Sequence, residues 1–421
     1  MTFSLLTYDL SQDQEIAQLI TKEQNRQSSS ICLIASENIA SRAVAQAQAS
    51  CFMNKYAEGT VNKRFYQGCE VVDEMEALCQ SRLCSLFDVK FANVQPHSGA
   101  QANMAVLNAL LNGGDTILGM NLQSGGHLSH GFKLNFSGKY YNAVQYNVDP
   151  DTCLINYAQL HDLARKHGPK LIIAGASSYS RHIEWNKLNL IAKEIGAYLL
   201  ADIAHIAGLI AGKALPNPMR YVDIITGTTH KTLRGPRGGF IATNSETLIK
   251  QINSSVMPGI QGGPLMHTIA AKAVCFRECA TSEFMQYARQ VIINAKAMVE
   301  VFRKYQVPIV ANGTDNHMFI IDVRCFDLTG KAAANLLAQH GLVCNYNAIP
   351  FDPLPLMETC GIRIGTPSIT SCGFDETDCR KLAIAIVCIL RRKMTQIERD
   401  FYLHDLFAKV DLTYRQIYKE N

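Results

Sequence analysis

Short apolar runs alternate with segments of helical periodicity between about residues 70 and 250, and this alternation constrains the fold more than any other feature. The apolar runs have strand length and lie at 116–118, 170–176, 197–201, 222–226 and 239–243. Helical spacing appears between some of them, as over 186–195, where Gly196 ends the pattern. Continuous apolar strands are typical of sheets covered on both faces. The sequence therefore predicts an α/β fold with a mostly parallel sheet flanked by helices.

The pattern changes beyond residue 280. A long helix over 284–305, a strand over 317–323, a helix ending at Gly341 and a helical segment from about Glu376 predict a smaller α+β unit. The first 30 residues are polar and helix-prone. We therefore expect an N-terminal helical arm (1–30), a large α/β domain (31–280) and a small C-terminal α+β domain (281–421).

Composition excludes several classes of function. The chain is 48% hydrophobic and 18% charged with a net charge of +4, and its basic run at 391–393 is short, so we expect no nucleic-acid partner. The fourteen cysteines form no C-x-x-C pair; the pairs 275/279 and 79/84 lie in helix-like apolar segments and indicate buried thiols rather than a metal site. With neither a secretory signal nor an apolar stretch of about 18 residues, we expect a cytoplasmic protein without a membrane partner.

Two predicted strands end in residues that suit one kind of chemistry. Asp202 follows the run at 198–201, with His205 three residues later, and Lys231 follows the run at 222–226. A lysine among hydroxyls and glycines suits imine formation, and a strand-end aspartate can hold a pyridine nitrogen protonated. Taken alone, each signal is weak, because such an aspartate is usually a cap and a lone loop lysine is usually solvated.

Three glycine-rich turns could hold an anionic or flat ligand. Ser98 and Gly99 immediately precede a helix whose N-terminus would attract phosphate, although a serine there is also an ordinary N-cap. The turn at 258–264 could supply further amides. In the turn at 124–128, His127 could stack on a flat ligand, although a lone histidine is more often structural.

The segment Thr-Thr-His-Lys-Thr-Leu at 228–233, followed by Gly-Pro-Arg-Gly-Gly at 235–239, resembles the cofactor-lysine signature of serine hydroxymethyltransferases. These are fold-type I pyridoxal-phosphate enzymes, related in fold to aspartate aminotransferase, with a seven-stranded sheet. Other blocks resemble the family in the same order, so that the likeness covers essentially the whole chain: 33–38, 54–59, 93–99, 119–122, 125–128, 261–267, 313–317 and 361–367.

The resemblance implies that pyridoxal 5'-phosphate is bound covalently as an imine on Lys231, with Asp202 at the pyridine nitrogen and His127 stacked on the ring. Ser177 and His205 would lie near the phenolic oxygen. The phosphate would be bordered by residues of both subunits of an obligate homodimer, and whether dimers pair into tetramers stays open. The implied cofactor-binding residues are Ser36, Tyr56, Ser98, Gly99, His127, Ser177, Asp202, His205, His230, Lys231, Arg237, Gly262 and Gly263.

The resemblance also implies the substrates serine and glycine, with tetrahydrofolate as cosubstrate. Arg363 would clamp the substrate carboxylate with Ser36, Glu58 would transfer a proton, and Tyr66 would orient the substrate beside Phe65. The implied catalytic residues are Lys231, Asp202, His230, Glu58 and Tyr66. The implied folate-binding residues are Leu122, Gly126, His127, Leu128, Asn347, Pro355, Leu356 and Met357.

Several positions depart from the family pattern. Phe65 stands where the first of two tyrosines is usual, and Ala100 replaces the second serine of the phosphate loop. Losing one donor to a charged group costs about 1.5–3 kcal/mol, which predicts weaker cofactor binding rather than none. The other departures lie mainly on the substrate and folate side: 60–62, Gln67, Met257, Tyr346 and 355–357.

The leading interpretation is therefore a reversible interconversion of serine and glycine that transfers the hydroxymethyl carbon to tetrahydrofolate. Two alternatives stay open at the level of the sequence. One is a folate-independent aldolase of β-hydroxy amino acids such as threonine, since the departures cluster near the folate. The other is a catalytically weak paralogue, which the changes at Phe65 and Ala100 favour.

Overall fold

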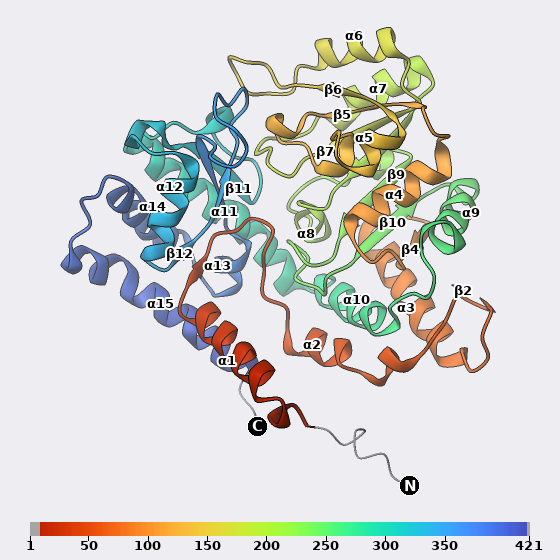
Figure 1. The fold of residues 1–421 in the computed structure, drawn as a ribbon, viewed down its shortest axis with the longest axis horizontal. Helices are drawn as coiled ribbons and strands as arrows, with labels where there is room; N and C mark the ends of the chain where they lie inside the picture. Colours follow the sequence, from red (N-terminus) through yellow and green to blue (C-terminus); the bar gives the residue numbers. More distant parts are fainter. Residues whose placement is uncertain (1–8, 419–421) are drawn as a thin grey trace.

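The computed structural model describes residues 9–418 and has a seven-stranded sheet at its centre (Figure 1). The five strands from β9 to β6 are parallel, and β10 runs antiparallel to both of its neighbours. The prediction of a mostly parallel, seven-stranded α/β sheet is confirmed. In spatial order the strands are β4 (Phe91–Asn93), β10 (Gly239–Thr243), β9 (Ile224–Thr228), β8 (Tyr198–Asp202), β7 (Leu171–Gly175), β5 (Thr116–Met120) and β6 (Asn142–Tyr146).

Helices cover both faces of this sheet. Ile172 of β7 packs into the core on one face, and the next residue, Ile173, packs into the core on the other. Because successive side chains point to opposite faces, a strand covered twice must be apolar throughout, which explains the uninterrupted runs in the sequence. The first face is covered by α3 (Glu70–Phe87), α7 (Trp185–Ile195) and α10 (Met266–Cys279), and the second by α4 (Gly99–Leu110) and α9 (Glu246–Ser254).

All five strands predicted for the large sheet are present, and the run at 239–243 matches β10 residue for residue. The sequence did not predict β4, which has only three residues, or β6. The strand β6 lies at the edge of the sheet and is half-exposed along most of its length, so its side chains do not form an apolar run.

A second, three-stranded antiparallel sheet lies in the C-terminal part. Its strands are β11 (Met318–Asp322), β14 (Gly361–Gly365) and β13 (Asn345–Asn347), in that order. The predicted final helix is in fact two helices, α14 (Glu376–Leu390) and α15 (Gln396–Tyr418). The core under this sheet also takes side chains from α12 (Gly330–Gln339).

One helix belongs to both cores. The first half of α11 (Ser282–Lys304) buries Phe284 and Val291 in the core of the large sheet, while its second half buries Met298 and Phe302 in the core of the small one. Figure 1 shows α11 running between the two parts. The domain boundary near residue 280 stays a prediction.

The N-terminal helix α1 (Gln14–Ser28) lies alongside α15 and has no buried residue (Figure 1). All fourteen cysteines, which lie between residues 32 and 388, are free. Among residues 9–418, no helix combines the length and apolar character needed to cross a membrane. The remaining elements are α2 (Arg42–Gln48), α5 (Phe136–Tyr140), α6 (Tyr157–His167), α8 (Ala207–Ala211), α13 (Pro367–Ser371), β1 (Ile31–Cys32), β2 (Gly59–Thr60), β3 (Lys63–Arg64) and β12 (Leu342–Val343).

Candidate functional site

A cavity of about 460 Å³ lies at the carboxyl ends of β7, β8 and β9. Ligands gather at this edge of an open α/β sheet because the loops there leave a crevice. Glu37, Ala100, Ala176, Ala204 and Thr228 contribute to its wall. The residues predicted from the sequence that line it are Ser36, Ser98, Gly99, His127, Ser177, Asp202, His205, His230, Lys231, Arg237 and Arg363.

Lys231 lies in the loop that follows β9. The side-chain amide of Asn38 donates a hydrogen bond to its main-chain carbonyl (3.0 Å), which fixes the loop. Removal from water, helped by the nearby cations Arg363 and Arg237, lowers the pKa of the Lys231 amine to about 8 although Asp202 acts in the opposite direction. At neutral pH most of the amine is still protonated, but the neutral, nucleophilic fraction is much larger than for an ordinary lysine.

The carboxylate of Asp202, at the end of β8, is held by three hydrogen bonds. Oδ1 accepts from the main-chain N–H of Ala204 (3.0 Å), and Oδ2 accepts from Asn103 (2.8 Å) and His130 (2.9 Å). Burial by itself raises the pKa of Asp202, but the hydrogen bond from His130 and smaller contributions from His127 and Asn103 outweigh it and hold the pKa below its ordinary value. A carboxylate has about four acceptor positions, so Asp202 keeps one for a group in the cavity.

His130 is completely buried, and its hydrogen bonds define its tautomer. Its Nδ1 accepts from the main-chain N–H of His127 (3.2 Å), so the proton lies on Nε2 and is donated to Asp202. The His127 ring accepts at Nδ1 from Ser129. Burial, the largest cause, lowers the pKa of His127 to about 4, so this ring at the cavity wall is neutral at physiological pH.

His127, His130 and Asp202 could in principle be read as a metal site, because their ligand atoms lie within 4.8 Å of one another. The hydrogen-bond pattern gives each of them another role. The proton on His130 Nε2 points to Asp202, and His127 Nδ1 accepts from Ser129. We therefore interpret the group as support for the carboxylate.

Two further histidines stack in the wall behind Lys231. His205 Nδ1 and His317 Nε2 are 3.2 Å apart, and the ring centroids are 5.4 Å apart with an interplanar angle of 24°. Burial lowers the pKa of His205 well below its usual value and that of His317 to about 3. Both rings are therefore neutral, and one donates to the other.

The turn between β4 and α4 forms another part of the wall. Ser98 caps α4 by accepting from the N–H of Gln101, as an ordinary N-cap serine does, and also faces the cavity. A Cβ atom at residue 99 would lie 2.6 Å from Thr228 Cγ2, so only glycine fits there. The Nδ1 atom of His230 is buried without a hydrogen-bond partner among residues 9–418. An unpaired buried polar atom at a cavity indicates that a ligand completes its hydrogen bonding.

Arg363, in the middle of β14, brings a buried cation to the cavity. Its Nε donates to Asn345 Oδ1 (3.1 Å) and its Nη1 to the carbonyl of Ser177 (2.6 Å). Burial lowers its pKa to about 10, so the guanidinium stays charged at neutral pH. Three of its five N–H groups are left for a ligand, which suits a carboxylate.

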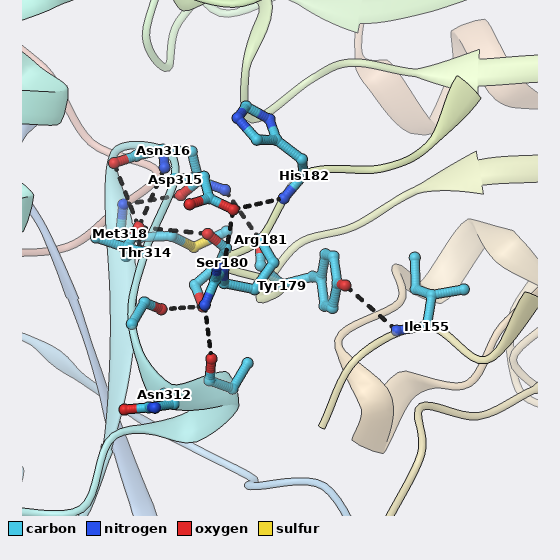
Figure 2. Close-up of polar contacts among 12 residues, drawn as sticks. Ile155, Tyr179, Ser180, Arg181, His182, Asn312, Thr314, Asp315, Asn316 and Met318 are labelled. Atoms are coloured by element: carbon cyan, nitrogen blue, oxygen red, sulfur yellow. Dashed lines mark hydrogen bonds and ion pairs between the residues drawn. The ribbon is translucent and has the colours of Figure 1, made fainter. Parts of the chain in front are cut away.

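The segment at 179–182, which follows the cavity residue Ser177, is joined to the segment at 311–318 by a dense set of polar contacts (Figure 2). Arg181 pairs with Asp315 (2.9 Å) and donates to the carbonyl of Ala311 (2.9 Å). Ser180 donates to the carbonyl of Gly313 (2.7 Å). We call these contacts the 180–315 clasp. It connects the end of β7 to the start of β11, and therefore sets the carbonyl of Ser177 relative to the small sheet that carries Arg363.

A family model described as serine hydroxymethyltransferase matches residues 10–386. The chain belongs to the serine hydroxymethyltransferase family. A serine hydroxymethyltransferase from Ehrlichia chaffeensis is 53% identical over 385 residues, 91% of each chain. One from Ehrlichia ruminantium is 53% identical over 376 residues, 89% of each chain, and one from Endomicrobium trichonymphae is 52% identical over 379 residues, 90% of this chain and 91% of that one. The fold class expected from the resemblance is confirmed.

Serine hydroxymethyltransferases depend on pyridoxal phosphate, and the residues of the cavity fit this group. Arg363, Arg237 and Lys231 give the wall three cationic side chains, against the carboxylates of Asp202 and Glu37. The free acceptor position of Asp202 suits a protonated ring nitrogen. The unpaired Nδ1 of His230 and the glycine-lined turn at Gly99 suit a phosphate.

Other residues implied by the family resemblance lie outside the cavity of their own chain. Tyr56, Glu58 and Tyr66 form a group in which the Tyr66 hydroxyl is 3.5 Å from Glu58 Oε2 and the two rings are 5.2 Å apart. Gly262 and Gly263 adjoin this group, since Cβ atoms there would approach Glu58 and Tyr56 to 3.1 and 3.0 Å. We call these five residues the Tyr56 cluster. Tyr56 (56%), Tyr66 (42%) and Gly262 of this cluster are exposed, Glu58 and Gly263 are partly buried, and Phe65 is 76% exposed.

The predicted folate residues other than His127 also lie outside the lining of this cavity within the described chain. Asn347 lies on β13, two residues from the Asn345 that binds Arg363. Gly126 packs so tightly against the end of β5 that a Cβ would lie 2.0 Å from the carbonyl of Met120. Leu122 and Leu128 belong to short helical turns on either side of Gly126, while Pro355, Leu356 and Met357 form an exposed loop.

Sequence reasoning missed several residues of the site. Asn103 and His130 hold Asp202 but were not identified, and neither was His317. A signal existed for two of them. Asn103 is a polar residue one turn after Gly99 on the apolar face of α4, and His130 follows His127 within the same turn.

Proposed function

We propose that this chain is an active serine hydroxymethyltransferase. It interconverts serine and glycine, transfers the hydroxymethyl carbon to tetrahydrofolate, and binds pyridoxal 5'-phosphate covalently through Lys231. One observation carries the proposal: Lys231, Asp202, His127 and Arg363, from four distant segments, line a single cavity. The family assignment gives no support to the folate-independent aldolase.

Each residue of the cavity has a separate role in this proposal. Lys231, with its lowered pKa, supplies a neutral amine for the aldehyde of the cofactor. Asp202, kept ionised by His130 and Asn103, holds a proton on the ring nitrogen. When bound, pyridoxal phosphate supplies an electron sink that weakens bonds at the α-carbon of the amino acid. Arg363 orients the substrate by binding its carboxylate, with Ser36 beside it.

Glu58 and Tyr66 act on the site of a neighbouring subunit in this proposal. Tyr66 is exposed and Glu58 is partly buried on their own chain, and neither lines its cavity within residues 9–418, as expected of residues that complete the site of a partner subunit. Glu58 would hold or move the proton of the serine hydroxyl, and Tyr56 with the Gly262–Gly263 amides would reach the phosphate. The active form is thus a homodimer with shared sites, which we place in the cytoplasm.

Tetrahydrofolate would approach the cavity past His127, between the turn at 122–128 and the segment that carries Asn347 and residues 355–357. The exposed Leu128, Leu356 and Met357 offer apolar surface for a pterin ring system. Serine cleavage measured with and without tetrahydrofolate tests this assignment. Equal rates would contradict the role of folate and leave the covalent cofactor untouched.

The covalent role of Lys231 is tested by chemical trapping. The purified protein is treated with borohydride in the presence of pyridoxal phosphate, and the tagged peptide is sequenced. We expect the label on Lys231 and its loss in Lys231→Ala. A label on another lysine would contradict the proposal. Phe65→Tyr addresses the weak-paralogue alternative: a several-fold change in turnover is compatible with an active wild type, whereas a rise from no turnover to normal turnover is not.

A further inference from the structure

Lys272 is a buried charged residue that the proposed mechanism does not use. It lies in α10, is 1% exposed, and takes part in no ion pair within residues 9–418. The nearest carboxylate that affects it, Glu76, has both oxygens engaged, Oε2 by Arg64 (2.6 Å) and Oε1 by Gln95 (2.9 Å). Burying an ammonium group in this way costs folding free energy unless its charge interacts favourably with other groups.

All three donors of Lys272 reach main-chain carbonyls. Its Nζ donates to Val94 (2.7 Å), Pro96 (3.1 Å) and Gly239 (2.8 Å). Burial lowers its pKa to about 8, but only the protonated amine has three N–H groups to donate. The hydrogen-bond pattern therefore describes a cation, and at pH 7 most of the amine is protonated.

These carbonyls belong to the two loops that form the phosphate side of the cavity. Val94 and Pro96 lead into Ser98 and Gly99, while Gly239 ends the turn that contains His230 and Arg237. The loops also contact each other directly, because the N–H of Gly239 donates to Pro96 (3.0 Å).

The lysine side chain shapes this turn as well. A Cβ at Gly238 would lie 2.4 Å from Lys272 Cε, so the stem of Lys272 occupies the space that a side chain at residue 238 would need. Its charge also reaches the cavity. After burial, which is the largest cause, Lys272 contributes to lowering the pKa of His97 and, with Arg237 and Lys231, that of His230.

We propose that Lys272 is a positioning residue for the phosphate side of the cofactor site. Its ammonium group holds the loop with Ser98–Gly99 against the turn with His230–Arg237 and supplies positive charge behind both. This inference rests on the proposed function. It adds a cation from α10 to a phosphate loop that carries Ala100 in place of a hydroxyl donor.

The test compares two ligands that differ only in the phosphate. The full chain, freed of cofactor, is titrated at pH 7 with pyridoxal 5'-phosphate and with pyridoxal, and the dissociation constants are measured by absorbance. In Lys272→Met we expect affinity for pyridoxal phosphate to fall roughly tenfold or more, the size of one lost charge-assisted interaction, while affinity for pyridoxal stays within about twofold. A purely structural role would weaken both ligands together.

Two further variants keep the test decisive. Lys250→Met removes an equally charged but exposed lysine from α9 and should leave both affinities unchanged. Lys272→Gln removes the charge but keeps donors for the carbonyls, and replaces the methionine variant if thermal unfolding shows that the latter does not fold. Equal losses for both ligands, or no loss, would overturn the inference. Failure of the wild type to bind either ligand through Lys231 would instead overturn the proposed function.

Discussion

The amine of Lys231 shows how strongly burial acts on a single residue of this site. Its pKa falls to about 8, from the ordinary 10.5, because the amine leaves water and lies near Arg363 and Arg237. Only the neutral amine attacks an aldehyde. We therefore expect the rate of cofactor attachment to rise with pH and to level off above about pH 8, as followed by absorbance after pyridoxal phosphate is mixed with the cofactor-free chain.

Replacing Arg363 by leucine should move this pH dependence. The guanidinium disfavours the protonated form of Lys231, so its removal raises the pKa of the amine and shifts the midpoint of the rate profile to higher pH. Arg324→Leu is the control, since Arg324 is exposed and pairs with Asp322 away from the cavity. An unshifted midpoint in the Arg363 variant would show that the two charges do not interact as proposed.

Ala100 lines the cavity one residue after Gly99, where the family pattern has a serine. We expect Ala100→Ser to strengthen binding of pyridoxal phosphate by about 1.5–3 kcal/mol, the usual contribution of a hydrogen bond to a charged group. Equilibrium titration of the cofactor-free chain measures this change. Affinity for pyridoxal should stay the same, and a tighter complex with both ligands would point to a general change in the loop.

At the level of elements, the 180–315 clasp sets the position of β14 relative to β7. It joins the residues after β7 to those before β11 (Figure 2). The strand β11 pairs along its whole length with β14, which carries Arg363. The carbonyl of Ser177, five residues before His182, accepts from Arg363. The proposed substrate carboxylate site is therefore assembled from two segments that the clasp helps to hold together.

We expect Asp315→Asn to loosen this arrangement. The substitution removes the negative charge that pairs with Arg181, so the clasp positions Arg363 less accurately. We therefore expect KM for serine to rise about threefold to tenfold, with a smaller change in kcat. Asp322→Asn is a matched control, because it breaks a pair with Arg324 at the other end of β11. If both variants raise KM equally, general softening of the small sheet explains the effect better than the clasp.

At the level of the whole molecule, the Tyr56 cluster does not line the Lys231 cavity of its own chain within residues 9–418, which predicts complementation between subunits. Lys231→Ala and Glu58→Gln should each be inactive as homodimers. When equal amounts of the two variants are mixed, unfolded and refolded together, about a quarter of the wild-type activity should be recovered. Half of the dimers are then hybrids, and each hybrid has one intact site of two. Recovery near zero would place Glu58 in the site of its own chain.

Features of this molecule could be predicted where neighbouring residues in the sequence carry a recognisable pattern. The strands β5, β7, β8, β9 and β10 were predicted because burial on both faces makes each of them largely apolar. The edge strand β6 and the three-residue β4 were not, since neither forms such a run. Lys231 and Asp202 were predicted as site residues because each follows a strand visible in the sequence and because the surrounding segments resemble the family, and both line the cavity.

The sequence by itself determined the α/β class, the family and the reactive groups, because these follow from residue types at short spacing along the chain. Only the tertiary structure decided how those groups are charged and held. Asn103 reaches Asp202 across 99 residues, and Lys272 reaches Val94 across 178. Such contacts depend on the crossing of helices and strands, so a local pattern can mark a buried polar residue but cannot identify its partner. The same burial sets the pKa values on which the chemistry rests.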